Sequence, residues 1–289
     1  MTRRIAVNGI ELAVAEAGTG YPVLLLHGFP ELAHSWRYQL PALAAAGFHA
    51  VAPDLRGYGG SDKPTDINAY GLLTLVDDVI GLVDALDYEK VAMVAHDWGA
   101  IIAWTAALTH RDRIERLVSL NVPYRGRCSA FPPIDYIREN LSDRFGYVLM
   151  LQEPGVAEAW FASDPRQKLC GFYRAAAADP DFLSEDDFRV FLDAFTTGTL
   201  AGPANYYRNI DANHAATAHL ANALVTVPTM MVAADSDPVL PVSLLEGMDR
   251  WVPDLRVEIL EQCGHWTQQE SPGAVSRLLV DFLGDLAGV

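Results

Sequence analysis

The chain of 289 residues is 51% apolar and 20% charged, a composition that supplies a sizeable core and excludes a disordered or fibrous protein. Its formal net charge of −16 and the lack of any cluster of Lys and Arg argue against a nucleic-acid partner. The N-terminal stretch lacks the apolar run of a secretory signal, and no uninterrupted apolar run of about 18 residues predicts a membrane span.

Short apolar runs alternate with helical stretches along the first 120 residues, which is typical of a mainly parallel sheet whose strands are joined by helices. The first two runs flank Asn8-Gly9, a two-residue hairpin signal, and therefore predict an antiparallel start to the sheet. Further buried strands are predicted at residues 23–26, 49–52, 91–95 and 117–120, and two more strands at residues 229–234 and 256–260. Helical spacing of apolar residues predicts helices over residues 72–86 and 275–286. Together these signals predict an α/β fold with an eight-stranded sheet flanked by helices.

Residues 124–225 differ from the rest, because they contain helical and aromatic stretches but no convincing parallel strand. Pro123 and Pro228 stand near the borders of this segment, where they interrupt regular structure. We interpret the segment as a helical lid inserted into an α/β core that consists of residues 1–123 and 226–289.

The main chemical signal is the motif AHDWG, whose central residue is Asp97. A predicted buried strand runs into this motif and an almost wholly apolar helix follows it, which indicates a nucleophile elbow. The small residues Ala95 and Gly99 suit a tight turn, where bulk would collide with the neighbouring helix and strand. The alternative interpretation is that Asp97 only caps the helix.

An Asp at this turn, in place of the usual Ser, indicates alkyl transfer. Serine attacking an sp³ carbon would form an ether, which water does not readily cleave. Asp97 forms an ester instead, and water can hydrolyse that ester at its carbonyl carbon. Acyl substrates of the esterase and lipase kind are therefore not expected.

Two later residues complete a catalytic set in the order nucleophile, acid, histidine. Asp237 follows the penultimate predicted strand and His265 follows the last one, and loops at strand ends bring such residues together. Asp235 is the alternative acid. Asp237 is preferred because it opens the loop with Pro238, whereas Asp235 is nearer the strand end.

The motif HGFP follows another predicted strand and lies where this architecture places an oxyanion-hole donor. We assign the hole to the backbone N–H groups of Phe29 and Trp98, which would stabilise charge on the Asp97 carboxyl oxygen during ester hydrolysis. His27 is interpreted as a residue that orients this loop. The glycine-rich stretch RGYGGS lacks both a Lys-Ser/Thr ending and a GxGxxG pattern, so no nucleotide site is expected.

The motifs HGFP, RGYGGSDKP, HDWGA and CGHWTQ together resemble the core motifs of the α/β-hydrolase-fold epoxide hydrolases, and the resemblance extends over nearly the whole chain. It implies the α/β-hydrolase fold with an Asp nucleophile. Haloalkane and haloacetate dehalogenases share most of these motifs, so the motifs identify the branch of the fold more sharply than the substrate.

Two lid tyrosines favour an epoxide. Tyr147 precedes LQEPGVAE, a stretch similar to the one that carries the first ring-opening tyrosine of epoxide hydrolases, and Tyr207 matches the place of the second. By resemblance these phenols would protonate the leaving alkoxide, whereas a halide needs no proton. Fluoroacetate dehalogenases carry a His-Trp pair where this chain has Tyr147-Val148 and an Arg where it has Trp98. Plain packing is the alternative role for both phenols, and it is the preferred role for Tyr206.

The resulting hypothesis is an epoxide hydrolase whose partner is a small-molecule epoxide. Asp97 attacks an epoxide carbon, and water activated by His265 hydrolyses the alkyl-enzyme ester to release a vicinal diol. Trp36 and Met150 are expected to line an apolar pocket. A haloalkane or haloacetate dehalogenase and a non-catalytic receptor with the same fold are the two alternatives.

The cysteines Cys128, Cys170 and Cys263 are few and widely spaced. This spacing predicts reduced thiols in a cytoplasmic protein rather than a disulfide framework or a zinc motif. No metal or organic cofactor is expected, because side chains and water suffice for the hypothesised reaction. The sequence leaves open whether the chain forms a homodimer.

Overall fold

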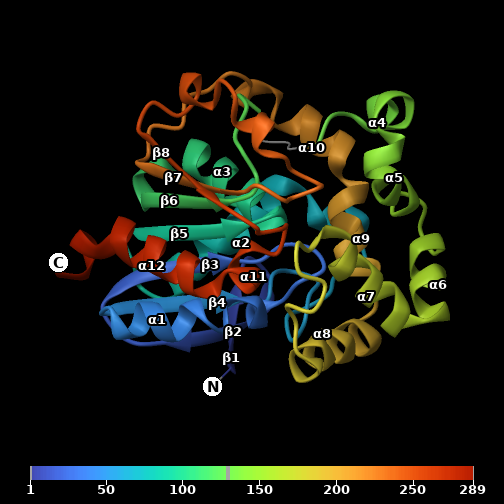
Figure 1. Cartoon of the computed structure of the whole chain (residues 1–289), viewed down its shortest axis with the longest axis horizontal. Coiled ribbons are helices and arrows are strands. Elements are labelled where there is room, and N and C mark those ends of the chain that lie inside the picture. Colours follow the sequence, from blue (N-terminus) through green and yellow to red (C-terminus); the bar gives the residue numbers. More distant parts are fainter. Residues whose placement is uncertain (1, 128–130, 289) are drawn as a thin grey trace.

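Eight strands form one sheet in the computed structural model, which describes residues 2–127 and 131–288. The strands lie in the order β1-β2-β4-β3-β5-β6-β7-β8 (Figure 1). Their bounds are β1 (Thr2–Val7), β2 (Ile10–Ala17), β3 (Tyr21–Leu26), β4 (Phe48–Pro53), β5 (Val91–His96), β6 (Ile114–Leu120), β7 (Thr229–Ala234) and β8 (Leu255–Leu260). β2 pairs antiparallel with β1 and with β4, and every other pairing is parallel. The predicted fold class and the antiparallel start are confirmed.

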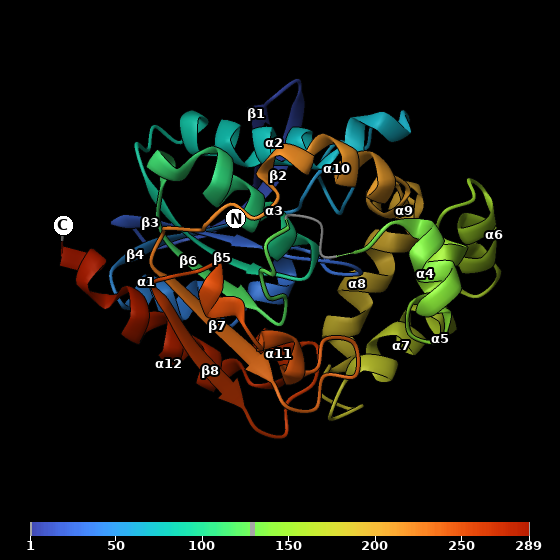
Figure 2. The same ribbon diagram turned by 90° about the horizontal axis from the view of Figure 1, so that it is seen from above.

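Helices cover both faces of the sheet because alternate residues of each central strand point to opposite sides. In β3, Val23 and Leu25 pack into a core with α1 (Gln39–Ala45) and α12 (Pro272–Leu283). Leu24 and Leu26 face the other core, which includes α2 (Leu72–Ala85) and α3 (Trp98–Thr109). Figure 2 shows these two helix pairs on opposite sides of the sheet. Both predicted apolar stripes therefore lie in helices that pack on the sheet.

The helix α3 is buried on nearly every side, which holds the residue before it in place. Ten of its twelve residues are buried, and the helix packs against α2, β3, β5 and β6. A helix enclosed in this way can move little, since interiors are packed as densely as organic crystals. The end of β5 and the start of α3 are consequently a rigid support for any group between them.

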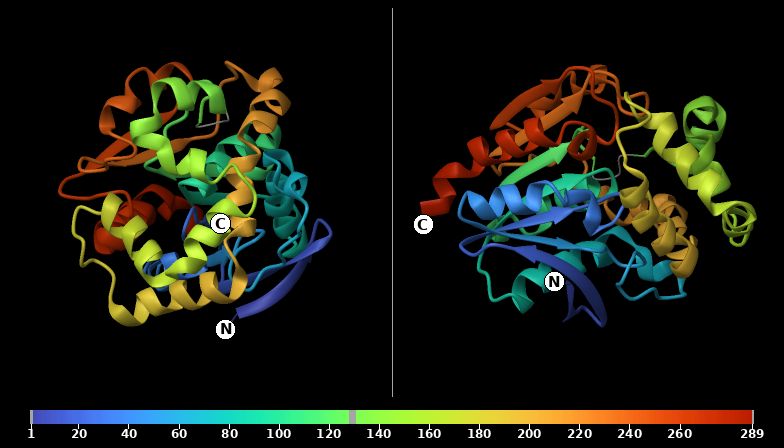
Figure 3. Two further views of the ribbon diagram at one scale, coloured as in Figure 1. Left: turned by 90° about the vertical axis from the view of Figure 1, so that its right-hand side faces the viewer. Right: turned by 60° about the horizontal axis from the view of Figure 1, so that its bottom comes forward.

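The described residues between β6 and β7 contain seven α-helices and no strand. Their bounds are α4 (Ile134–Asn140), α5 (Ser142–Met150), α6 (Val156–Ser163), α7 (Pro165–Ala176), α8 (Glu185–Gly198), α9 (Ala201–Arg208) and α10 (Ile210–Ala216). In the left view of Figure 3, helices of this segment lie in front of one end of the sheet. That end carries the loops that follow β3, β5, β7 and β8.

Several expectations concern what the fold does not contain. Within residues 2–127 and 131–288, no helix is long and apolar enough to cross a bilayer. Over the same residues, no group of three or more His, Cys, Asp and Glu side chains is arranged to hold a metal ion. Cys170 and Cys263 are free thiols, and Cys128 lies outside the described residues.

Candidate active site

Asp97 occupies the single position between β5 and α3, with φ +48° and ψ −119°. A non-glycine residue rarely adopts a positive φ, so the backbone here is strained and is kept so by its surroundings. The Asp97 side chain accepts no hydrogen bond from the first turn of α3, which speaks against a capping role. The turn is tight: a Cβ atom on Gly99 would lie 2.3 Å from the carbonyl oxygen of Leu26.

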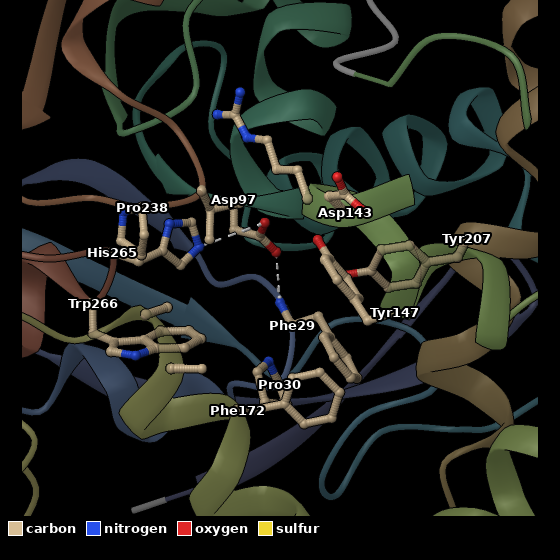
Figure 4. A pocket seen from close by; sticks show the side chains of 14 residues that line it. Phe29, Pro30, Asp97, Asp143, Tyr147, Phe172, Tyr207, Pro238, His265 and Trp266 are labelled. Carbon is tan, nitrogen blue, oxygen red and sulfur yellow. Dashed lines mark hydrogen bonds and ion pairs between the residues drawn. The ribbon is translucent and has the colours of Figure 1, made fainter. Parts of the chain in front are cut away.

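The Asp97 carboxylate is buried and held on one side only. The Phe29 N–H donates to Oδ1 over 2.8 Å, and a Cβ atom on Gly28 would lie 2.3 Å from that same oxygen (Figure 4). Of the two predicted oxyanion-hole donors, Phe29 thus contacts the carboxylate. The Trp98 N–H, although adjacent, donates no hydrogen bond to it in the part of the chain that the structure describes. The second oxygen, Oδ2, lies 3.9 Å from His265 Nε2, which is too long for a hydrogen bond.

His265 is oriented by Asp237, as the order of residues along the chain predicts. His265 Nδ1 lies 2.8 Å from Asp237 Oδ2, and that same oxygen accepts from the side-chain amide of Asn121 over 2.8 Å. Oδ1 of Asp237 accepts the backbone N–H groups of Val239 and Leu240 over 2.7 Å and 3.0 Å. With all these donors, Asp237 holds the imidazole in one orientation.

The alternative acid, Asp235, is exposed, and its carboxylate accepts the neighbouring hydroxyl of Ser236. It forms no ion pair with His265 among the described residues. The loop that begins after β7 turns Asp237 inward and leaves Asp235 on the surface. The structure therefore brings Asp237, and not Asp235, to the histidine.

The pKa values of this pair diverge because each charge stabilises the other. Burial alone would lower the pKa of His265, but the Asp237 carboxylate outweighs burial and raises the pKa to about 9. Burial would likewise raise the pKa of Asp237, yet the positive charge and hydrogen bond of His265 hold it well below its usual range. The two residues therefore form an imidazolium–carboxylate pair at neutral pH.

This ion pair predicts a specific dependence of stability on pH. Because the pKa of His265 is about 9 in the folded chain and about 6.5 when unfolded, its stabilisation is complete below about pH 6.5. The stabilisation is lost as the pH rises through about 9, by up to about 3 kcal/mol. Urea titrations between about pH 6 and pH 10 should show a steeper loss of stability for the wild type than for His265→Gln. Parallel curves for the two proteins would contradict the pairing.

Tyr147 on α5 and Tyr207 on α9 face Asp97 across a cavity. Their ring centroids are 5.9 Å apart, and both hydroxyl groups point toward the Asp97 carboxylate in Figure 4. Burial is the main cause that raises the pKa of both phenols well above 10. The negative charge of Asp97 raises it further. Both are therefore protonated at neutral pH and available as donors. Tyr206 points elsewhere and donates to the backbone carbonyl of Arg56 over 2.7 Å, which fits its predicted packing role.

Polar contacts between α9 and the turn after α5 fix the position of Tyr207. The side-chain amide of Gln152 donates to the Tyr207 carbonyl over 3.0 Å. Arg208, the next residue, donates to the Leu151 carbonyl over 3.0 Å and pairs with Glu158 at 2.9 Å. Since α5 carries Tyr147, these contacts join the two elements that carry the phenols.

The cavity has a volume of about 290 Å³ and opens between the loops at the strand ends and the helices above them. It is lined by Phe29, Pro30, Asp97, Asp143, Arg144, Tyr147, Phe172, Ala175, Ala176, Tyr207, Pro238, Val239, His265 and Trp266. The predicted pocket residues Trp36 and Met150 do not line it. Trp36 is fully buried in the core beneath the opposite face of the sheet, and Met150 packs against the larger core. For these two residues the prediction is wrong.

A buried ion pair beneath Asp97 was not predicted. Glu31 and His96 are both completely buried, with Glu31 Oε2 2.6 Å from His96 Nδ1, and His96 Nε2 lies 2.8 Å from the His265 carbonyl. Both ring nitrogens of His96 therefore face acceptor oxygens. Burial opposes the charge on Glu31, but His96 outweighs it and lowers the pKa of Glu31 to about 2. The pair ties the elbow to the loop that carries His265.

His27 orients its loop, as predicted. Its Nε2 accepts the backbone N–H of Leu55 over 3.0 Å, so its Nδ1 donates to the carbonyl of Gly28 over 2.8 Å. Burial lowers the pKa of His27. A neutral imidazole with both nitrogens engaged takes no further proton, so His27 is not a second base.

Comparison with known proteins shows which family and which enzymes this chain is similar to. A model of the alpha/beta hydrolase fold family matches residues 21–272. "Epoxide hydrolase A" of Mycobacterium tuberculosis is 38% identical, over 98% of this chain and 97% of the relative. "Bifunctional epoxide hydrolase 2" of Sus scrofa is 33% identical over 95% of this chain, which spans 53% of that protein. The crystal structure of epoxide hydrolase A from Mycobacterium thermoresistibile matches with a TM-score of 0.92 and 38% identity, covering 98% of each chain.

Proposed function

The chain belongs to the alpha/beta hydrolase fold family and, within it, to the epoxide hydrolases, and on this premise we propose that it converts an epoxide and water into a vicinal diol through a covalent ester on Asp97. One observation carries the mechanism: the buried Asp97 carboxylate faces the hydroxyl groups of Tyr147 and Tyr207 across one cavity, with His265 beside it. An anion, two acids and a base thus surround the space where a substrate binds.

In the first step Asp97 Oδ2, the oxygen not held by Phe29, attacks an epoxide carbon. The carbon–oxygen bond of the ring breaks, and its electron pair passes to the ring oxygen. Tyr147 and Tyr207 hold that oxygen and one of them gives it a proton, which an alkoxide requires and a halide does not. The charge of Asp97 is one cause of the raised pKa of both phenols, and ester formation removes that charge. The phenols therefore become stronger acids as the step proceeds.

The Asp97 charge is also one cause of the raised pKa of His265, and ester formation removes that charge, which favours the neutral imidazole. In the second step neutral His265 removes a proton from water, which attacks the carbonyl carbon of the Asp97 ester. The Phe29 N–H, already 2.8 Å from Oδ1, stabilises the oxyanion, and the Trp98 N–H is the second donor. The ester bond breaks, and the departing alkoxide takes the remaining proton of the attacking water, which completes the diol and restores the Asp97 carboxylate. The proton held by His265 returns through solvent to the phenolate. A lid at residues 124–225 supplies both phenols and closes the cavity.

The lid tyrosines provide a test with a matched control. Tyr147→Phe and Tyr207→Phe should each lower kcat/KM for an epoxide by about 10²-fold, and the double variant by about 10⁴-fold. Tyr206→Phe also removes one buried hydroxyl, but its hydrogen bond goes to Arg56, so turnover should stay near that of the wild type. Steady-state diol formation measures all four variants. Wild-type rates in the double variant would mean that the phenols only pack.

The substrate class is tested by assaying one preparation for two products. We expect diol from aryl and alkyl epoxides and no halide from haloalkanes or haloacetates. Halide without diol would replace the proposal with a dehalogenase. Absence of both products, together with saturable binding of an epoxide, would favour a non-catalytic receptor.

A further inference from the structure

Asn121, the residue directly after β6, contacts the acid of the catalytic set. Its backbone has φ +64°, a left-handed conformation that Asn tolerates better than most residues, and its N–H donates to the Val232 carbonyl of β7 over 2.9 Å. The side chain is buried, and its amide nitrogen lies 2.8 Å from Asp237 Oδ2. The turn after β6 thus directs a buried amide at the carboxylate that orients His265.

Thr267 holds the Asn121 amide in one orientation. The pKa of Asp237 is well below its usual range, so its carboxylate only accepts hydrogen bonds. The amide N–H of Asn121 must therefore face Asp237, and the amide carbonyl must face the other way. Thr267 Oγ1 donates to this carbonyl oxygen over 2.6 Å. Thr267 is fully buried and stands two residues after His265, so the amide connects the loop after β6 with the loops that carry the acid and the base.

Asn121 is the one side chain that shares an oxygen of Asp237 with His265 among the described residues. The backbone N–H groups of Val239 and Leu240 both bind the other oxygen, Oδ1. Without the amide, Oδ2 would be held by the imidazole alone, and the two rings of contacts could shift together. A displacement of about 1 Å at a catalytic group can lower a rate by about 10²-fold.

We propose that Asn121 is a positioning residue for the base. Held by Thr267, its amide anchors Asp237 Oδ2, and this oxygen keeps His265 directed at the water that attacks the ester. The inference rests on the proposed function, and it assigns Asn121 to the hydrolysis of the ester alone. Neither Asn121 nor Thr267 lines the cavity in the part of the chain that the structure describes, so formation of the ester does not depend on them.

Asn121→Gly tests the amide without straining the backbone, because glycine adopts a positive φ freely. After rapid mixing with excess epoxide, intact-protein mass spectrometry of quenched samples measures both steps. We expect ester formation to keep its wild-type rate and ester hydrolysis to slow about 10- to 100-fold, so that adduct accumulates. Asn222→Gly, at an exposed Asn with the same φ of 64°, is the matched control and should keep both rates.

Thr267 provides a second pair of variants. Thr267→Val keeps the branched shape but loses the hydroxyl that holds Asn121, and it should also slow ester hydrolysis. Thr267→Ser keeps the hydroxyl and should recover most of the rate that Thr267→Val loses. A packing role predicts the opposite order, because serine leaves a cavity where the methyl group was.

A charge at position 121 gives a measurement that needs no turnover. The carboxylates of Asp237, Asp97 and Glu31 each raise the pKa of His265. Asn121→Asp adds a carboxylate beside Asp237 and should raise that pKa further, by about one unit. Nuclear magnetic resonance of the ring nitrogens measures the pKa, and the rise of the hydrolysis rate with pH should move to higher pH by a similar amount.

The outcomes separate this inference from the proposed function. Wild-type hydrolysis or equal slowing of both steps in Asn121→Gly, or a wild-type pKa of His265 in Asn121→Asp, overturns the inference and leaves epoxide hydrolysis intact. Absence of adduct in every protein, His265→Gln included, would contradict the covalent reaction and this inference with it.

Discussion

Asp97→Ala is expected to abolish diol formation, with kcat/KM at least about 10⁴-fold below that of the wild type. The variant removes the carboxylate that attacks the epoxide, and among the described residues only Asp237 also forms an ion pair with His265. Asp237, the nearest candidate, is held by Asn121 and by two backbone N–H groups and faces the far side of the imidazole. Diol production from a racemic aryl epoxide measures the loss.

A folding control is needed because Asp97 lies in a strained, buried turn. The thermal unfolding midpoint of Asp97→Ala should stay close to that of the wild type, since the backbone contacts of α3 are unchanged. A folded variant that retains more than about a hundredth of wild-type activity would show that water opens the ring directly, without an ester.

His265→Gln should trap the ester. Ring opening needs Asp97 and the phenols, whereas hydrolysis needs a base, so the variant should react once and then stop. Intact-protein mass spectrometry should show nearly stoichiometric protein heavier by one substrate mass, and proteolysis should place the addition on the peptide that contains Asp97. Turnover should fall by about 10³-fold or more.

The double variant Asp97→Ala with His265→Gln is the control for this trap. It lacks the same base and also lacks the nucleophile, so its mass should stay unchanged in saturating epoxide. Adduct on the double variant would indicate unspecific alkylation of a surface group. An unmodified mass in His265→Gln, after incubation with a reactive epoxide, would contradict covalent catalysis.

The strands and the contacts around Asp97 could be predicted because each depends on local sequence. The elbow AHDWG lies between a buried strand and an apolar helix, and Asp237 and His265 each follow a strand. In a parallel sheet, such loops meet at one edge whatever the rest of the chain does. The geometry of Asp237 and His265 therefore agrees with their order along the chain.

The contacts among the buried polar side chains beneath the site could not be predicted in the same way. His96 pairs with Glu31, 65 residues away, and with the His265 carbonyl, 169 residues away. The spacing of apolar residues along the chain carries no information on contacts between residues so far apart. The one local signal is that His96 lies within the motif AHDWG and that Glu31 directly follows the motif HGFP.

The prediction of the pocket residues was wrong for a different reason. Trp36 and Met150 are large and apolar, and such side chains fit a core as well as a cavity. Whether such a side chain lines the core or the cavity depends on how the lid helices pack. The helix α5 is itself interrupted at Phe145, where φ is −114° and ψ is 27°. Arg144, beside this irregular residue, lines two cavities, a position that no local sequence signal indicates.

The covalent Asp97 ester is tested most directly by a single turnover, with enzyme in excess over epoxide, in water enriched in oxygen-18. If Asp97 supplies the oxygen, the diol formed should be unlabelled and the label should appear in the carboxylate of Asp97. A diol that carries the label, with an unlabelled Asp97 peptide, would contradict the account, because the oxygen would then have come from water in one step.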